Sequence, residues 1–97
     1  MSTHTVPQAE KTVSLADPMK FCAALAKKVD AYEKKRRQVK IFFNGEETTK
    51  GAMGLMVNLT SIPTIFTLRV QVTGYETEEE GQKIAEEVMG SVKAYLA

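Results

Sequence analysis

Residues 65–72 read I-F-T-L-R-V-Q-V, and this stretch decides the fold class because its side chains alternate without a break. Such alternation with a period of two is typical of a β-strand that buries only one of its faces. Strands of this kind belong to antiparallel sheets that pack on one side and meet water on the other. The face expected to be buried carries Phe66, Leu68, Val70 and Val72, and the other face carries Ile65, Thr67, Arg69 and Gln71.

Three shorter segments are expected to pair with this strand. Residues 11–15 and 39–43 alternate in the same way, with branched or aromatic side chains on one face. Asn44 and Gly45 follow the second segment, and both residue types tolerate the positive φ angles that a tight hairpin turn needs. The returning strand, residues 46–49, is short and polar, which suits the edge of a sheet.

Asp17 and Pro18 predict the start of a helix that runs to about Tyr32. An aspartate at the N-cap accepts hydrogen bonds from free N–H groups of the first turn, and proline fits the first helical position. The apolar residues then recur at helical spacing and form one stripe. That stripe comprises Phe21, Leu25, Val29 and Tyr32, and Cys22 and Ala24 flank it.

Two further helices are expected. Residues 51–59 (G-A-M-G-L-M-V-N-L) form a short apolar segment, which we interpret as a short helix started by Thr49 or Gly51. Thr77 and Glu80 have the spacing of a capping box, in which each side chain binds a backbone N–H of the other residue. The last helix that follows would carry one apolar face made of Ile84, Val88, Met89, Val92, Tyr95 and Leu96.

The resulting order, β-α-β-β-α-β-α, predicts an α+β protein. We expect an open-faced two-layer sandwich in which a four-stranded antiparallel sheet carries its helices on one face. Residues 11–97 would form a single domain, preceded by a flexible polar tail at residues 1–10.

The composition is that of an ordinary globular protein. The 97 residues are 43% hydrophobic and 26% charged, and the net charge of +1 gives no general attraction to nucleic acids or membranes. One cysteine excludes an intrachain disulfide and favours a reducing compartment. There is neither a signal peptide nor an apolar run long enough to span a bilayer, so we expect a cytoplasmic protein.

Three stretches resemble the HPr family, the small phosphocarriers of the bacterial sugar phosphotransferase system. They are K-T-V-S-L-A-D at 11–17, V-K-I-F-F-N-G at 39–45 and K-G-A-M-G-L-M at 50–56. The last is similar to the lysine-serine-isoleucine-methionine-glycine-valine-methionine segment at the second helix of Gram-positive members. The resemblance implies four antiparallel strands, two long helices and a short one, namely the HPr-like sandwich.

The chain departs from the family at both phosphorylation positions. Family members carry the phosphoryl group on a histidine at the start of helix one, and Phe21 stands at or next to that acceptor position. Gly51 stands at the position of the regulatory serine. His4 is the sole histidine and lies in the expected tail. The resemblance therefore implies a non-enzymatic protein without phosphoryl transfer, as in the histidine-lacking Crh proteins, although Crh proteins keep the serine that is missing here.

Under this interpretation, the chain is a regulatory or protein-binding module. Its partner would be a transcription regulator, an Enzyme I-like protein or a metabolic enzyme, and the residues expected at the interface are Lys20, Phe21, Met53 and Met56. For Phe21 we favour packing in the core with the helical stripe. The two methionines fit either an adaptable docking surface or the core.

Other readings remain open. The first is an active phosphocarrier with an unusual acceptor, the second is a nucleic-acid binder built on Lys34 to Arg37, and the third is an unrelated α+β binding domain. For the basic cluster we favour a solvated helix end, where cations complement the helix dipole. For Cys22 we favour a small buried hydrophobe over a reactive thiol. One histidine and one cysteine far apart make no metal site, and no cofactor is expected.

Overall fold

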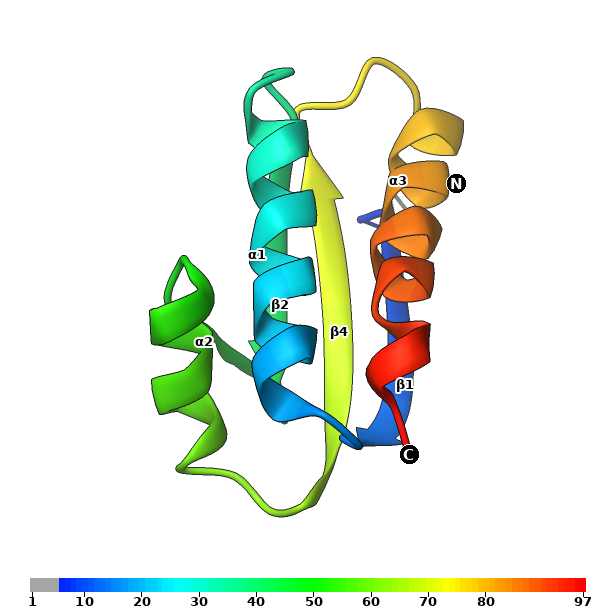
Figure 1. Cartoon of the computed structure of the whole chain (residues 1–97). Helices are drawn as coiled ribbons and strands as arrows, with labels where there is room; N and C mark the ends of the chain where they lie inside the picture. Colours follow the sequence, from blue (N-terminus) through cyan, green and yellow to red (C-terminus); the bar gives the residue numbers. More distant parts are fainter. Residues whose placement is uncertain (1–5) are drawn as a thin grey trace.

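The computed structural model describes residues 6–97, in which four strands form one antiparallel sheet in the order β1-β4-β2-β3. The long helices α1 and α3 lie side by side over one face of this sheet, and α2 lies beside α1 (Figure 1). The fold is therefore α+β, and its layering is compatible with a two-layer sandwich. In chain order the elements are β1 (Gln8–Ser14), α1 (Pro18–Glu33), β2 (Gln38–Phe43), β3 (Glu46–Glu47), α2 (Ala52–Leu59), β4 (Ile65–Thr73) and α3 (Glu78–Ser91), followed by a 3-10 turn at Lys93–Tyr95.

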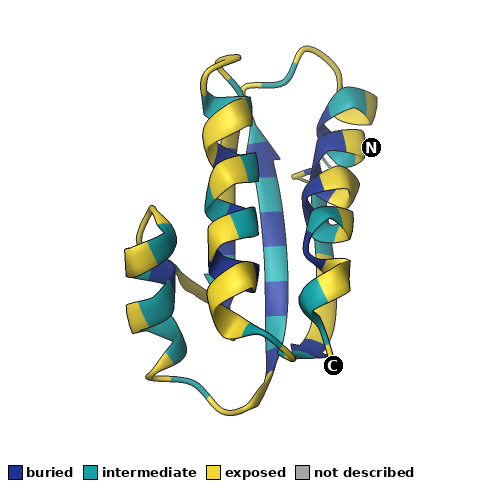
Figure 2. Ribbon diagram, in the orientation of Figure 1, coloured by how far each residue is buried: buried dark blue, intermediate teal, exposed yellow. Residues whose placement is uncertain are grey.

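Strand β4 lies at the centre of the sheet and confirms the alternation expected from its sequence. Its side chains are buried in every second position, which Figure 2 shows as alternating bands along the strand. In the register, Phe66 lies opposite Val13 of β1, and Val70 lies opposite Ile41 of β2. All four of these side chains are buried. Each such side chain contributes roughly 1.5–3 kcal/mol on transfer from water, so this face supplies much of the stability of the fold.

Helix α1 starts as its sequence predicts. Asp17 is the N-cap, its Oδ1 accepts a hydrogen bond from the N–H of Lys20 at 3.1 Å, and Pro18 is the first helical residue. The stripe that follows packs on the sheet, since Phe21, Leu25 and Val29 are all buried. This packing fixes the start of the helix against the buried face of the sheet.

The expected hairpin is also present. Asn44 and Gly45 adopt φ angles of 50° and 81°, as the sequence predicts for this turn. The return strand β3 is shorter than expected, because the chain leaves the ladder after two residues. Both the N–H and the hydroxyl of Thr48 instead donate to the carbonyl oxygen of Ile41, at 2.9 and 3.0 Å.

Strand β1 starts three residues earlier than the sequence suggested. Gln8, Ala9 and Glu10 pair with Gln71, Val70 and Arg69 of β4, so this part of the expected tail belongs to the sheet. The long central strand explains the difference, because it offers pairing partners that the local sequence of the tail does not reveal. Residues 1–5 of the expected tail lie outside the described residues.

The last helix is shorter than its apolar face implied. Helix α3 ends at Ser91, and Tyr95 and Leu96 lie in or after the 3-10 turn. The carbonyl oxygen of Tyr95 accepts from the N–H of Ala16 at 2.8 Å, and Leu96 bridges Leu15. Pairing with the β1–α1 connection therefore replaces the last helical turn. No helix within residues 6–97 is long and apolar enough to cross a membrane.

Helix α3 has half of the expected capping box. The hydroxyl of Thr77 accepts from the N–H of Glu80 at 3.1 Å, as predicted. The Glu80 carboxylate, however, accepts from the N–H of Glu76 at 3.0 Å rather than from Thr77. It also receives two hydrogen bonds from Arg37, at 2.9 and 3.2 Å, which draw the carboxylate toward the α1–β2 connection.

Candidate protein-binding surface

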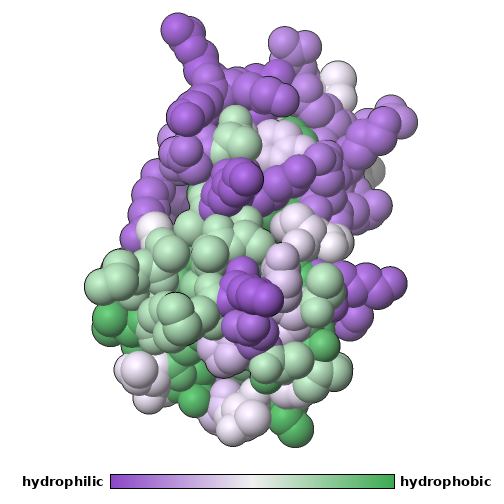
Figure 3. Space-filling model, in the orientation of Figure 1, coloured by the Kyte–Doolittle hydropathy of each residue, from purple (hydrophilic) through white to green (hydrophobic). Residues whose placement is uncertain are grey.

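The first turn of α1 and the outer side of α2 expose large apolar side chains. Met19 is 73% exposed, Met53 is 82% exposed and Val57 is 65% exposed. Figure 3 shows hydrophobic residues gathered on the lower half of the face that it displays, over α2 and the start of α1. Apolar side chains that gather on a surface mark interaction sites more often than scattered ones do. We call Met19, Lys20, Met53, Met56 and Val57 the α1–α2 surface.

A small apolar groove adjoins this surface. It has a volume of about 290 Å³ and lies between the β1–α1 connection, the end of α2 and the α2–β4 loop. A groove of this size holds one or two apolar side chains rather than a cofactor. Its apolar lining includes Leu15, Pro18, Met56, Leu59, Ile62 and Pro63.

Phe21 does not belong to the α1–α2 surface. Its exposed fraction is 0%, and its ring lies 6.3 Å from the ring of Phe43 and 6.5 Å from that of Phe66, measured between centroids. A direct contact between Phe21 and a partner is therefore excluded, and the alternative of core packing is confirmed. The helical stripe explains the difference, because Phe21 shares it with Leu25 and Val29.

The other three residues expected at an interface do reach the surface. Lys20 and Met53 are exposed, and Met56 is half-buried beside the apolar groove. Sequence reasoning missed Met19 and Val57. Met19 could have been found from its spacing, because two positions along a helix correspond to about 200° of rotation and Phe21 marks the buried side.

Gly51 caps the start of α2 in a backbone conformation that favours glycine. Its φ and ψ angles are 86° and 157°, and its carbonyl oxygen accepts from the N–H of Leu55 at 3.0 Å. An L side chain at this φ is strained. The helix is held from its other end as well, since Asn58 Oδ1 accepts from the N–H and hydroxyl of Thr49 at 2.9 and 3.0 Å.

Cys22 is a buried thiol without a polar function. It is fully buried in the core, and burial raises the pKa of its thiol to about 11. At neutral pH the thiol is therefore protonated and inert. This confirms the expectation of a small buried hydrophobe. Among residues 6–97 no cluster of three potential metal ligands is present.

Half of the basic cluster, Lys34 to Arg37, at the end of α1 forms ion pairs with acids of the same chain. Arg37 lies 2.9 Å from Glu80 and 3.7 Å from Glu76, and Lys34 lies 3.4 Å from Asp30. The hydrogen bonds from Arg37 lower the pKa of Glu80 below its usual value. Two of the four basic residues are thus paired with acids, which favours the helix-end interpretation of this cluster.

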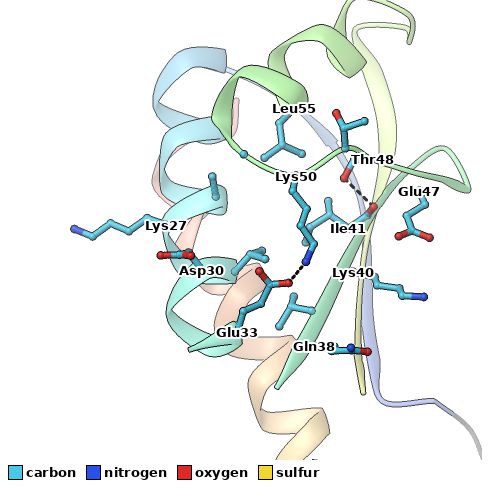
Figure 4. A pocket seen from close by; sticks show the side chains of 15 residues that line it. Lys27, Asp30, Glu33, Gln38, Lys40, Ile41, Glu47, Thr48, Lys50 and Leu55 are labelled. Atoms are coloured by element: carbon cyan, nitrogen blue, oxygen red, sulfur yellow. Dashed lines mark hydrogen bonds and ion pairs between the residues drawn. The ribbon is translucent and has the colours of Figure 1, made fainter. Parts of the chain in front are cut away.

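A larger hollow lies on the other side of α2. It has a volume of about 670 Å³ and is enclosed by α1, by β2 and by residues 47–51 (Figure 4). Lys50 and Glu33 form an ion pair across it. Its inner wall is apolar and includes Val29, Ile41 and Leu55, whereas its rim is charged. No sequence pattern predicts this hollow, because its walls come from segments far apart in the chain.

Comparisons of the chain with models of protein families, with curated proteins and with solved structures return no match.

Proposed function

We propose that this chain is an HPr-like protein that does not transfer phosphoryl groups and that acts as a regulatory, protein-binding module. One observation carries the proposal. The residue at the acceptor position, Phe21, is buried in the core, while Met19 in the first turn of α1 and Met53 and Val57 of α2 are exposed. The start of α1 thus lacks phosphoryl chemistry but keeps a surface suited to a partner.

The fold supports the HPr-like assignment. Its element order is β-α-β-β-α-β-α, its four strands are antiparallel, and it has two long helices and one short helix. Those are the features that the resemblance of the three sequence stretches implies. The sheet order is β1-β4-β2-β3, and α1 and α3 lie together on one face of the sheet, with α2 against α1.

Physical chemistry supports the absence of phosphoryl transfer from this site. A phosphocarrier needs a nucleophile at a helix N-terminus, where free N–H groups stabilise the added charge. The first turn of α1 contains Pro18, Met19 and Lys20, none of which is an acceptor of that kind. The nearby thiol of Cys22 is buried, with a raised pKa. The proposed module therefore works at the start of α1 by binding rather than by phosphoryl transfer.

The proposed partner is another bacterial protein of the cytoplasm: a transcription regulator, an Enzyme I-like protein or a metabolic enzyme. The α1–α2 surface offers it two methionines, whose flexible thioethers adapt to a partner surface. Lys20, 3.9 Å from Asp17 and exposed, adds a cation at the rim. The apolar groove next to Met56 would accept an apolar side chain of the partner.

The experiment is an affinity capture from the native bacterial cytoplasm with identification of bound proteins by mass spectrometry. We expect a specific partner that binds the wild-type chain and is lost with Met53→Glu, since a charge would then be buried at the interface. Ala31→Glu is the matched control, because Ala31 is also an exposed helical residue but lies near the far end of α1. Retention of the partner by Met53→Glu, or equal loss with both variants, would overturn the proposal.

A further inference from the structure

The outer edge of β2 is only partly covered by β3. The two-residue strand β3 pairs with Phe42 and Phe43, and Thr48 adds a hydrogen bond to the carbonyl oxygen of Ile41. Beyond this point the chain turns away toward α2. Over residues 38–40, the described part of the chain provides no neighbouring strand on this side.

The hydrogen-bond pattern shows which backbone groups this leaves free. The N–H of Asn44 donates to the carbonyl oxygen of Thr67 in β4, at 2.9 Å, whereas the carbonyl oxygen of Ile41 accepts from Thr48 on the opposite side. In an antiparallel ladder successive residues point their backbone groups to opposite sides. The N–H and C=O of Val39 and the N–H of Ile41 therefore point away from β4. Within residues 6–97 these three groups have no backbone partner.

The hollow of about 670 Å³ lies directly over this open edge (Figure 4). Val39 and Ile41 line it together with Val29 of α1 and Leu55 of α2, so its inner wall is apolar. An added strand would point every second side chain to the same face as Val39, and hence into the hollow. The site thus combines free backbone groups with a pocket that admits an apolar side chain.

The charges around the hollow favour an acidic occupant. The two acids on the α1 side are already paired, Asp30 with Lys34 and Glu33 with Lys50. Lys27 and Lys40 line the hollow without an ion-pair partner among residues 6–97, and Glu47 is the one acid of the lining that lacks a basic partner there. Lys40 and Glu47 point away from the hollow (Figure 4), so these two unpaired cations and one unpaired acid leave a positive excess around the open edge of β2 rather than inside the hollow.

We propose that the edge of β2 binds an extended, acidic segment of a partner protein by strand addition. The segment runs antiparallel to β2 and exchanges hydrogen bonds with Val39. An apolar side chain opposite Val39 enters the hollow, and an acidic side chain lies opposite Lys40 on the other face of the sheet, where opposite charges stabilise a cross-strand pair. A second copy of this chain would bring Lys40 rather than an acid to the same edge.

The test uses the full chain and two synthetic peptides with blocked ends, acetyl-Thr-Glu-Val-Glu-Val-Glu-amide and the same peptide with lysine in place of each glutamate. We expect saturable binding of the acidic peptide alone, observed as shifts of backbone amide resonances. In the complex, hydrogen exchange of the Val39 amide should slow by about tenfold or more, because it becomes hydrogen-bonded. Absence of binding, equal binding of both peptides, or unchanged exchange at this amide would overturn the proposal.

Variants test the geometry. Val39→Pro removes the free N–H but no bond to β4, so the sheet should remain and peptide binding should be lost. Lys40→Glu should weaken the acidic peptide by about tenfold, as expected for reversal of one charge in a cross-strand pair, and should favour the lysine peptide. Lys11→Glu, on strand β1, is the matched control and should leave binding unchanged.

Two further outcomes would show that the occupant or the peptide-binding surface is a different one. If the free chain forms a dimer that is lost with Lys40→Glu or Val39→Pro, the occupant is a second copy and the proposal is wrong. If Met53→Glu abolishes peptide binding while Lys40→Glu does not, the peptide occupies the α1–α2 surface instead. Because the lining of the hollow and the α1–α2 surface share no residue, failure at the β2 edge would leave the proposed function intact.

Discussion

The two ends of the molecule differ in how their surface side chains are paired. At the upper end in Figure 1, where α1 ends and α3 begins, charged side chains pair with one another across the two connections. At the lower end, where α1 begins and α2 ends, the surface is apolar (Figure 3). At the upper end, acidic and basic side chains of the same chain pair with one another. At the lower end, apolar side chains remain exposed, and a partner would bury them.

Arg37 illustrates the pairing of charged side chains at the upper end. Its guanidinium spans Glu76 and Glu80, and Glu80 also accepts the N–H of Glu76. Met19 shows the contrast at the lower end. It directly follows Pro18, the first residue of α1, and it is 73% exposed to water. Both residues lie next to helix termini, but only the first has its interactions inside the chain.

The largest expected effect is a loss of stability on substitution of a buried residue at the lower end, compared with an exposed residue nearby. Phe21→Ala should lower the free energy of unfolding by about 3–5 kcal/mol, because it leaves a cavity between two other aromatic rings. Urea unfolding followed by circular dichroism measures the loss. Met19→Ala, two residues away and exposed, should change stability by less than about 0.5 kcal/mol. Equal effects of the two changes would contradict the assignment of Phe21 to the core.

A smaller effect is expected at the start of α2. Gly51→Ser introduces the residue type that the HPr resemblance places there, but at φ and ψ angles of 86° and 157° it should destabilise the fold by about 1–3 kcal/mol. The same urea assay checks this value. Gly90→Ser is the control, because Gly90 is helical and a Cβ there meets no atom within 4 Å. A stabilising effect of Gly51→Ser would show that the start of α2 adopts another conformation.

The upper end should make stability depend on acid pH. The hydrogen bonds from Arg37 lower the pKa of Glu80 in the folded state, so the stabilisation they give is present above about pH 4.5 and is lost as the pH falls through the lowered value. Arg37→Met should therefore flatten the dependence of the urea midpoint on pH between neutral and acid conditions. Glu79→Gln, in the same helical turn, provides the control. An unchanged pH profile in Arg37→Met would contradict the pairing.

The smallest expected effect concerns the exposed methionine of α2. Met53→Glu should change the free energy of unfolding by less than about 0.5 kcal/mol, since the side chain is 82% exposed and packs little. Its effect on partner capture should be large by comparison. Thermal or urea unfolding of the purified variant checks the first value, and a marked loss of stability would show that Met53 supports the fold rather than an interface.

Local sequence patterns predicted most of the fold. The alternation in β4, the capped start of α1 and the Asn44–Gly45 turn each reflect one short-range rule, and the structure confirms all three. The errors lie where distant segments decide the outcome. The start of β1 depends on pairing with β4, and the end of α3 depends on hydrogen bonds to the β1–α1 connection.

The candidate sites were predictable only in part. Helical spacing placed Phe21 on the buried stripe, and it could equally have placed Met19 on the exposed side. The open edge of β2 was hidden from the sequence, because it arises from the early departure of the chain after Glu47. Likewise, the hollow over that edge needs α1 and α2 in their folded positions.

The most direct test of the account is intact-mass spectrometry of the purified chain after incubation with phosphoenolpyruvate and Enzyme I. An active HPr protein in the same reaction serves as the positive control, and neutral or alkaline handling preserves acid-labile phosphohistidine. We expect the control to gain one phosphoryl group and this chain to keep its original mass. Stoichiometric gain of a phosphoryl group by the wild-type chain would contradict the claim that its surface works by binding alone.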